Sequence, residues 1–118
     1  MASPTSTGRA AEQLAADHLA AQGLEILDRN WRNRWCELDI VARRGRTIHF
    51  IEVKYRASTA YGLPAEYVNH NKSTRLMRAA TAWNQAHRHS GPYQIDLISL
   101  TGALERPAIE YLPAAVGL

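Results

Sequence analysis

The sequence predicts an α/β fold in which a mixed central β-sheet is flanked by α-helices. Two long segments carry apolar residues at helical spacing, and four or five shorter ones are apolar, β-branched or alternating. Their order is helix, three strands, helix, and then one or two strands, which is typical of a mixed sheet with helices packed on it. With 118 residues, of which 46% are hydrophobic, the chain is expected to form one domain, residues 1–118.

Residues 8–22 form the first predicted helix, because small and apolar side chains recur there at helical spacing. Gly23 follows where a helix stop is expected. Residues 1–7 are small and polar, and we expect them to be flexible. Three strands are then predicted, at residues 24–31, 36–43 and 47–55. The third strand is apolar on both faces until Glu52, so it should lie near the middle of the sheet.

The second predicted helix covers about residues 72–88 and ends before a Gly-Pro pair. Its apolar stripe includes Trp83 and His87, which we expect to face the core. A further strand is predicted at residues 93–100, and a last one at residues 108–112.

Composition and charge narrow the classes of partner. A single cysteine, Cys36, excludes an internal disulfide and a cysteine-based zinc site. The net charge is +3, and every basic residue except Lys54 and Lys72 is an arginine. One guanidinium group can donate two parallel hydrogen bonds to the oxygens of a phosphate, so this bias favours a nucleic-acid partner. A general compositional preference for arginine explains it equally well. No apolar run approaches the roughly 20 residues that span a bilayer, and no signal peptide is evident, so we expect a cytoplasmic protein without membrane contact.

Charged side chains converge in the hairpin between the second and third strands. A two-residue type II′ turn beginning at Gly45 sets a register in which Asp39 lies opposite Glu52. Glu37 and Lys54 then lie opposite each other on the same face. A three-residue loop would instead place the two central acids on opposite faces.

Two carboxylates directly opposed on neighbouring strands repel each other, and a divalent cation relieves that repulsion. Mg²⁺ or Mn²⁺ takes oxygen ligands, so Asp39 and Glu52 are candidate metal ligands. Lys54 can orient or deprotonate a water or stabilise charge on a phosphate, which would suit metal-assisted hydrolysis. The alternative is a solvated surface ladder in which Glu37 simply pairs with Lys54.

The ordered set of Asp39 and Glu52-Val53-Lys54 resembles the D…E-x-K signature of the PD-(D/E)xK nuclease superfamily. The wider pattern is similar to the YraN-like bacterial family, which is related to archaeal Holliday-junction resolvases. It is carried by GRAAE at 8–12, NWR at 30–32, ELDIVA at 37–42, FIEVKYR at 50–56, Lys72 and Asp96. The resemblance implies a restriction-endonuclease-like fold over nearly the whole chain and, by analogy with resolvases, a homodimer.

The resemblance also implies roles for four residues. Asp39 and Glu52 match the family's metal ligands, and Lys54 matches its catalytic lysine. Glu12 matches an acidic residue of the first helix that leans toward the same site. Its alternative interpretation is that of an acid in the first turns of a helix, where the macrodipole favours negative charge.

Two positions depart from the family pattern. Cys36 stands where the family usually has glycine, which affects only a turn. Gln94 stands where it usually has arginine, which weakens a substrate contact or a structural contact. Neither departure touches the central acids and lysine.

Three cations are candidate nucleic-acid contacts, namely Arg32, Arg56 and Lys72. Arg32 belongs to a segment, residues 30–35, that interleaves aromatic rings with cations, and such patches stack bases and hold phosphates. We favour the simpler interpretation that the two tryptophans of this segment, Trp31 and Trp35, pack on the sheet.

The sequence therefore predicts a metal-dependent endonuclease that uses Mg²⁺ or Mn²⁺ to hydrolyse phosphodiester bonds in DNA. Branched DNA and repair intermediates are its candidate substrates. One alternative is a nucleic-acid-binding module with a nuclease-like fold and little or no catalytic activity. Another is a protein-interaction domain in a DNA uptake or repair assembly.

Overall fold

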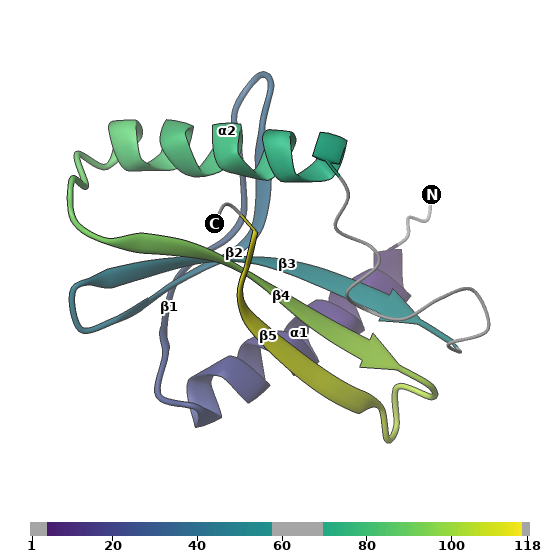
Figure 1. Cartoon of the computed structure of the whole chain (residues 1–118). Coiled ribbons are helices and arrows are strands. Elements are labelled where there is room, and N and C mark those ends of the chain that lie inside the picture. Colours follow the sequence, from purple (N-terminus) through teal and green to yellow (C-terminus); the bar gives the residue numbers. More distant parts are fainter. Residues whose placement is uncertain (1–4, 58–69, 117–118) are drawn as a thin grey trace.

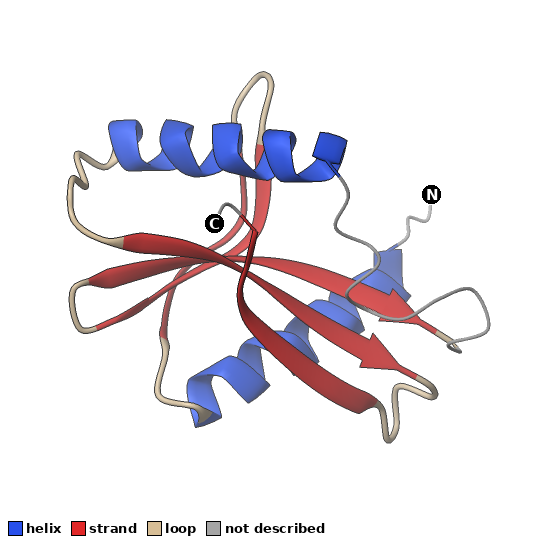
Figure 2. Cartoon of the chain, in the orientation of Figure 1, coloured by secondary structure: helices blue, strands red, loops and turns tan. Residues whose placement is uncertain are grey.

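A five-stranded mixed β-sheet with one α-helix on each face makes up the fold (Figures 1 and 2). The computed structural model describes residues 5–57 and 70–116. The elements are α1 (Thr5–Ala21), β1 (Glu25–Arg32), β2 (Glu37–Arg44), β3 (Thr47–Arg56), α2 (His70–Ala86), β4 (Tyr93–Thr101) and β5 (Ala108–Val116). The predicted α/β class is confirmed, and the arrangement is compatible with a restriction-endonuclease-like fold.

The sheet has the order β1-β2-β3-β4-β5, so the strand that is apolar on both faces is central, as predicted. β3 pairs antiparallel with β2 and parallel with β4. Parallel neighbours need a long crossover connection, and α2 lies within the one that joins β3 to β4.

The β2–β3 hairpin has the predicted register. Gly45 has a φ of 59°, which the first position of a type II′ turn requires, and Arg44 pairs with Thr47. The ladder continues to the pair formed by Ile40 and Ile51 and ends there. Glu37, which was expected to face Lys54 across the ladder, instead pairs with Arg32 of β1.

Each face of the sheet has its own hydrophobic core. On the α2 face, Phe50 and Trp83 pack together in a T-shaped contact with ring centroids 5.6 Å apart. On the α1 face, Leu19 packs with Ile51 and Ile98. Figure 1 shows the two helices on opposite sides of the sheet. The core is therefore built from alternating strand residues that point toward one helix or the other.

The helix boundaries differ from those predicted. α1 includes residues 5–7, which were expected to be flexible; residues 1–4 lie outside the described part of the chain. α2 ends at Ala86, so the prediction that His87 is a core residue is wrong: His87 lies beyond the helix, exposed, and stacks on Trp83. The guanidinium of Arg44 donates to the carbonyl of Gln22, just past the end of α1. Neither described helix is long and apolar enough to cross a membrane.

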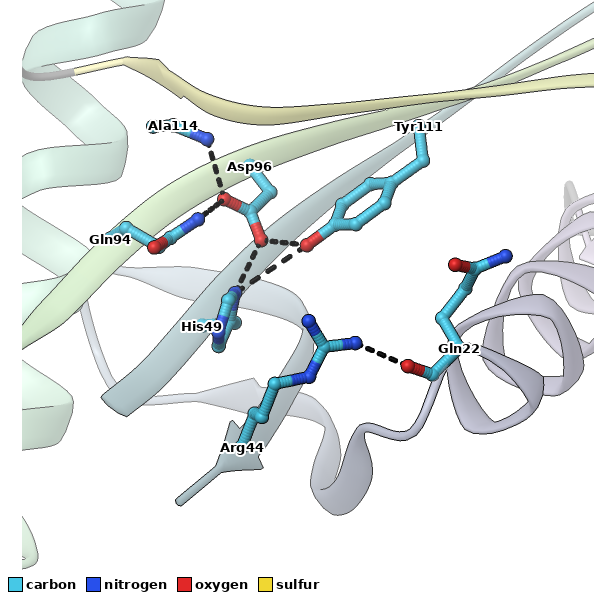
Figure 3. A network of polar contacts seen from close by, with 7 residues as sticks. All are labelled: Gln22, Arg44, His49, Gln94, Asp96, Tyr111 and Ala114. Carbon is cyan, nitrogen blue, oxygen red and sulfur yellow. Dashed lines mark hydrogen bonds and ion pairs between the residues drawn. The ribbon is translucent and has the colours of Figure 1, made fainter. Parts of the chain in front are cut away.

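A buried polar network ties the last strand to the sheet (Figure 3). At its centre is Asp96 on β4, which is fully buried. Its carboxylate accepts hydrogen bonds from Gln94 Nε2 at 2.8 Å, from the Ala114 backbone N–H at 2.8 Å and from the Tyr111 hydroxyl, and it contacts His49 Nδ1 at 2.7 Å. Ala114 lies where the β4–β5 register shifts, so the carboxylate binds a backbone donor at the irregular part of the ladder.

Candidate functional site

An open cleft of about 720 Å³ lies where β2 and β3 cease to pair. It is lined by the β1–β2 turn, by the ends of β2 and β3 and by the first half of α2, and we call it the main cleft. Five of the predicted site residues line it, namely Arg32, Asp39, Glu52, Lys54 and Lys72. Asp39, Glu52 and Lys54, which were expected on one face of the hairpin, lie in the same cleft, and Lys72 of α2 joins them there.

The separation of the two strands positions the Asp39 carboxylate. Beyond Ile40 the β2–β3 ladder is no longer continued by backbone hydrogen bonds. Asp39 Oδ2 instead accepts the backbone N–H of Val53 at 2.9 Å. A side chain thus replaces the next backbone carbonyl as acceptor, and the carboxylate is fixed in the gap between the strands.

The surroundings of Asp39 disfavour the charged form of its carboxyl group. The pKa of its carboxyl group is raised from 3.8 to about 7, mainly by burial and next by the negative charge of Glu52. The charges of Glu12 and Glu37 act in the same direction, whereas the hydrogen bond from Val53 lowers the pKa. Near neutral pH this carboxyl group therefore exists in both protonation states.

Glu52 is compensated by two ammonium groups. Its Oε2 lies 2.8 Å from Lys72 Nζ and 3.4 Å from Lys54 Nζ. Burial lowers the pKa of Lys72, and the neighbouring Lys54 charge acts in the same direction. The cluster of Asp39, Glu52, Lys54 and Lys72, which we call the carboxylate–lysine cluster, thus holds two acids and two bases in one cleft.

A second hollow, of about 520 Å³, adjoins the cluster, and we call it the side hollow. It is lined by residues of α1, β1, β2 and β3, and it shares Asp39 with the main cleft. Glu12 lines it, 2.7 Å from Asn30 Nδ2 and 3.5 Å from Arg29 Nη2. Glu12 lies well inside α1, which has no acid in its first turn, so the interpretation of Glu12 as a residue of the first turns is wrong.

The remaining predicted contacts divide into two groups. Arg32 lines both hollows, and Lys72 reaches Glu52 in the main cleft. Arg56, at the end of β3, is not among the described residues that line either hollow. Glu37 lines the main cleft, and its ion pair is with Arg32, at 4.0 Å, between two exposed side chains.

Two arginines and a tryptophan of the main cleft were not predicted as site residues. Arg75 and Arg78 follow Lys72 at intervals of three along α2, and that helical spacing was the signal that could have found them. Trp31 packs against the core of the α2 face, as expected, but Trp35 is 81% exposed and lines the cleft. The expectation that both tryptophans pack on the sheet is therefore wrong for Trp35.

The donor set fits one class of metal better than another. Within residues 5–57 and 70–116, no group of three or more His, Cys, Asp or Glu side chains is placed to hold an ion. A closed zinc site needs four protein ligands, so it does not fit the described residues. Mg²⁺ commonly takes only one or two carboxylates and completes its shell with waters and substrate phosphates, and Asp39 with Glu52 fits that requirement.

Comparisons with known proteins place the chain among relatives. The model of UPF0102, described as an uncharacterised protein family, matches residues 11–100, which include all the candidate site residues. A UPF0102 protein of Frankia casuarinae is 48% identical over 90 residues, which cover 76% of each chain. A UPF0102 protein of Rhodococcus opacus is 38% identical over 95% of this chain and 97% of its own. One of Stutzerimonas stutzeri is 42% identical over 86% of each chain.

Proposed function

The chain belongs to the UPF0102 family, and from that premise we propose that it is a metal-dependent endonuclease that hydrolyses phosphodiester bonds in DNA. One observation carries the proposal: two carboxylates from neighbouring strands share one cleft, and the charge of Glu52 helps to raise the pKa of Asp39 to about 7. The resemblance of these residues and Lys54 to the PD-(D/E)xK signature of the YraN-like proteins supports it. Acids with perturbed pKa values in a cleft mark candidate functional sites, and a metal ion held at such a site can polarise a phosphoryl oxygen.

Asp39 and Glu52 would hold the ion, which is proposed to be Mg²⁺ or Mn²⁺. Such an ion, when bound, polarises a phosphoryl oxygen and lowers the pKa of a bound water. The repulsion between the two acids supports this assignment, because a divalent charge relieves it. One carboxylate oxygen of Asp39 accepts the Val53 N–H. This hydrogen bond fixes the direction of the other oxygen before any ligand binds.

The two lysines supply positive charge beside the carboxylates. The Nζ atoms of Lys54 and Lys72 both lie within 3.4 Å of Glu52 Oε2. An ammonium group held there can stabilise negative charge that develops on a phosphate, and a neutral amine can accept a proton from water. Burial lowers the pKa of Lys72, which makes its neutral form more accessible than that of an exposed lysine.

The wider cleft suits a polyanion. Arg32, Arg75 and Arg78 line it together with the two lysines, so five cations face three acids. Guanidinium groups bind phosphate oxygens in pairs, and such contacts weaken as salt rises. The proposed setting is the cytoplasm, and the proposed polyanion is DNA. Branched or repair intermediates and a homodimer belong to the proposal by analogy with resolvases.

A second candidate is a nucleic-acid-binding module without cleavage activity. The observation that favours it is the ion pairing of Glu52, whose carboxylate already has two ammonium neighbours. A metal ion at Glu52 would compete with Lys72, which is only 2.8 Å away. In this alternative the lysines neutralise the acid permanently, and the arginines alone bind the backbone of DNA.

Cleavage assays on the whole chain test the proposal. The parent protein is incubated with linear and branched DNA in the presence of Mg²⁺ or Mn²⁺, beside Asp39→Asn, Lys54→Ala and a control, Glu110→Gln, which alters an exposed acid of β5. We expect cleavage by the parent and the control, and a loss of at least about 100-fold in both site variants. A second readout is thermal stabilisation by Mn²⁺, which Asp39→Asn should abolish.

The outcomes separate the two candidates. Salt-sensitive DNA binding without cleavage in either metal would establish the binding module and overturn the endonuclease. Cleavage that survives both Asp39→Asn and Lys54→Ala would show that the activity lies elsewhere or belongs to a contaminant. Circular dichroism spectra of all the variants check that lost activity does not reflect a lost fold.

A further inference from the structure

Trp35 has an unusual position for its residue type. Tryptophan is largely buried in most proteins, and burying a large apolar side chain is worth roughly 1.5–3 kcal/mol. Trp35 is nevertheless 81% exposed, whereas Trp83 is 4% exposed and Trp31 packs against the core. Among the residues that the structure describes, Trp35 is the only exposed large hydrophobic side chain that lines the main cleft.

The turn that carries Trp35 is held by several hydrogen bonds. The side-chain oxygen of Asn33 accepts the backbone N–H of Trp35 at 2.8 Å and that of Cys36 at 2.7 Å. The backbone N–H of Asn33 donates to the carbonyl of Cys36 at 2.9 Å. These bonds fix the backbone of the turn that carries the exposed ring. Because the turn is already ordered, less conformational entropy is lost when a ligand binds.

The ring stands beside cations and beside the carboxylate–lysine cluster. The guanidinium carbon of Arg34 lies 5.4 Å from the centroid of the Trp35 ring. Arg75 and Arg78 of α2 line the same cleft, as do Asp39 and Glu52. Figure 1 shows the β1–β2 turn rising past α2, which is consistent with a cleft formed between them.

An aromatic face next to cations matches one class of ligand well, a nucleic-acid strand whose bases are unpaired. Bases inside a duplex are stacked on both faces and cannot reach a protein ring, whereas unpaired bases stack on aromatic side chains while arginines hold the phosphates. We infer that Trp35 stacks on an unpaired base and thereby gives the main cleft a preference for single-stranded segments. This inference rests on the proposed function, because it places nucleic acid in the same cleft.

Binding measurements without metal test the inference apart from cleavage. The full chain, in EDTA, is titrated into a fluorescently labelled oligothymidine and into a blunt-ended duplex of matched charge, and the dissociation constants are read from anisotropy. Stacking contributes about 1–3 kcal/mol per base, so Trp35→Ala should weaken oligothymidine binding by roughly 10-fold or more. Duplex binding should change less than about 2-fold, and Trp35→Phe should retain most of the affinity.

A matched control removes an exposed apolar side chain outside the main cleft. Met77 is 45% exposed on α2, and Met77→Ala should leave both affinities unchanged. Tryptophan emission provides a second readout, since oligothymidine should quench the exposed Trp35 of the parent. That quenching should disappear in Trp35→Ala, in which Trp31 and Trp83 remain.

The possible results distinguish this inference from the proposed function. Oligothymidine binding that is unchanged in Trp35→Ala, or an equal loss for oligothymidine and duplex, would overturn the stacking role and leave the endonuclease proposal standing. A selective loss of oligothymidine binding in a protein that never cleaves DNA would support stacking and overturn the endonuclease. Failure of the parent to bind either ligand at low salt in EDTA would overturn the stacking role, whereas the endonuclease would still be decided by the cleavage assays with metal.

Discussion

Two aspartates of the same sheet have opposite environments. Asp96 on β4 is fully buried, and its carboxylate is surrounded by four polar groups from three strands (Figure 3). Asp39 on β2 is partly buried, accepts the N–H of Val53, and has three carboxylates near enough to raise its pKa. The more buried acid is therefore the better compensated one.

The difference indicates which aspartate is structural and which is available for chemistry. Hydrogen bonds to a carboxylate favour its charged form and make it a fixed part of the fold. Neighbouring negative charges do the opposite and leave a group that gains from binding a proton or a cation. We therefore assign Asp96 to the stability of the sheet, whereas the environment of Asp39 agrees with the ligand-binding role proposed for it.

The largest expected effect follows from removing the compensated acid. Asp96→Ala leaves His49, Gln94, Tyr111 and the Ala114 N–H without their shared acceptor inside the protein. Removing one partner from a buried charged network commonly costs about 3–5 kcal/mol. Since small domains are stable by only about 5–15 kcal/mol, we expect a large loss of stability in urea denaturation.

Asp17→Ala is the control for that substitution, because Asp17 is exposed on α1. It should change the free energy of unfolding by less than about 1 kcal/mol. A loss below about 1 kcal/mol for Asp96→Ala would show that the network does not hold β5 to the sheet. Asp96 could then no longer be contrasted with Asp39 as the structural aspartate.

The second prediction concerns the pH dependence of stability at Asp39. Its pKa is about 7 in the folded chain against 3.8 for a free carboxyl group, so protonation favours the folded state. That contribution is complete below about pH 3.8 and is lost as the pH rises through about 7. Asp39→Asn cannot ionise, and its amide oxygen can still accept the Val53 N–H.

Relative to the parent, Asp39→Asn should therefore gain stability between about pH 4 and pH 8, by on the order of 2 kcal/mol. Thermal denaturation of both proteins at a series of pH values measures the difference, and Asp17→Asn serves as a control in which it should stay flat. A difference that does not grow with pH would show that folding shifts the pKa of Asp39 no more than that of a surface acid.

The parts of this picture that the sequence predicted are local. The turn at Gly45 and the run of apolar residues in β3 depend on neighbouring positions, so the hairpin register and the central strand followed from pattern alone. The clustering of Asp39, Glu52 and Lys54 followed from that register, because alternation places every second residue on one face.

The parts that were missed depend on contacts between distant segments. Nothing near Asp39 in the sequence shows that the ladder ends at Ile40, which is what lets its carboxylate reach Val53. The exposure of Trp35 depends on a turn that carries the ring away from the core, although its neighbour Trp31 is packed. The donors around Asp96 come from three strands, so no local pattern predicts them.

The smallest expected effect concerns how much a more distant carboxylate contributes to the raised pKa of Asp39. Glu12 lies across the side hollow on α1, and its influence on Asp39 ranks below those of burial and Glu52. Its charge is also partly offset by Arg29, 3.5 Å away. Glu12→Gln should therefore lower the pKa of Asp39 by less than about one pH unit, and by less than Glu52→Gln does.

Titration of the Asp39 side-chain carboxyl carbon by NMR measures both shifts in the folded protein. Glu105→Gln, an exposed acid in the β4–β5 connection, is the control and should leave the titration unchanged. If Glu12→Gln moved the pKa as much as Glu52→Gln, the site would be centred between α1 and β2 and not between β2 and β3. If it moved nothing, α1 would contribute only packing, and the carboxylate–lysine cluster would be confined to the main cleft.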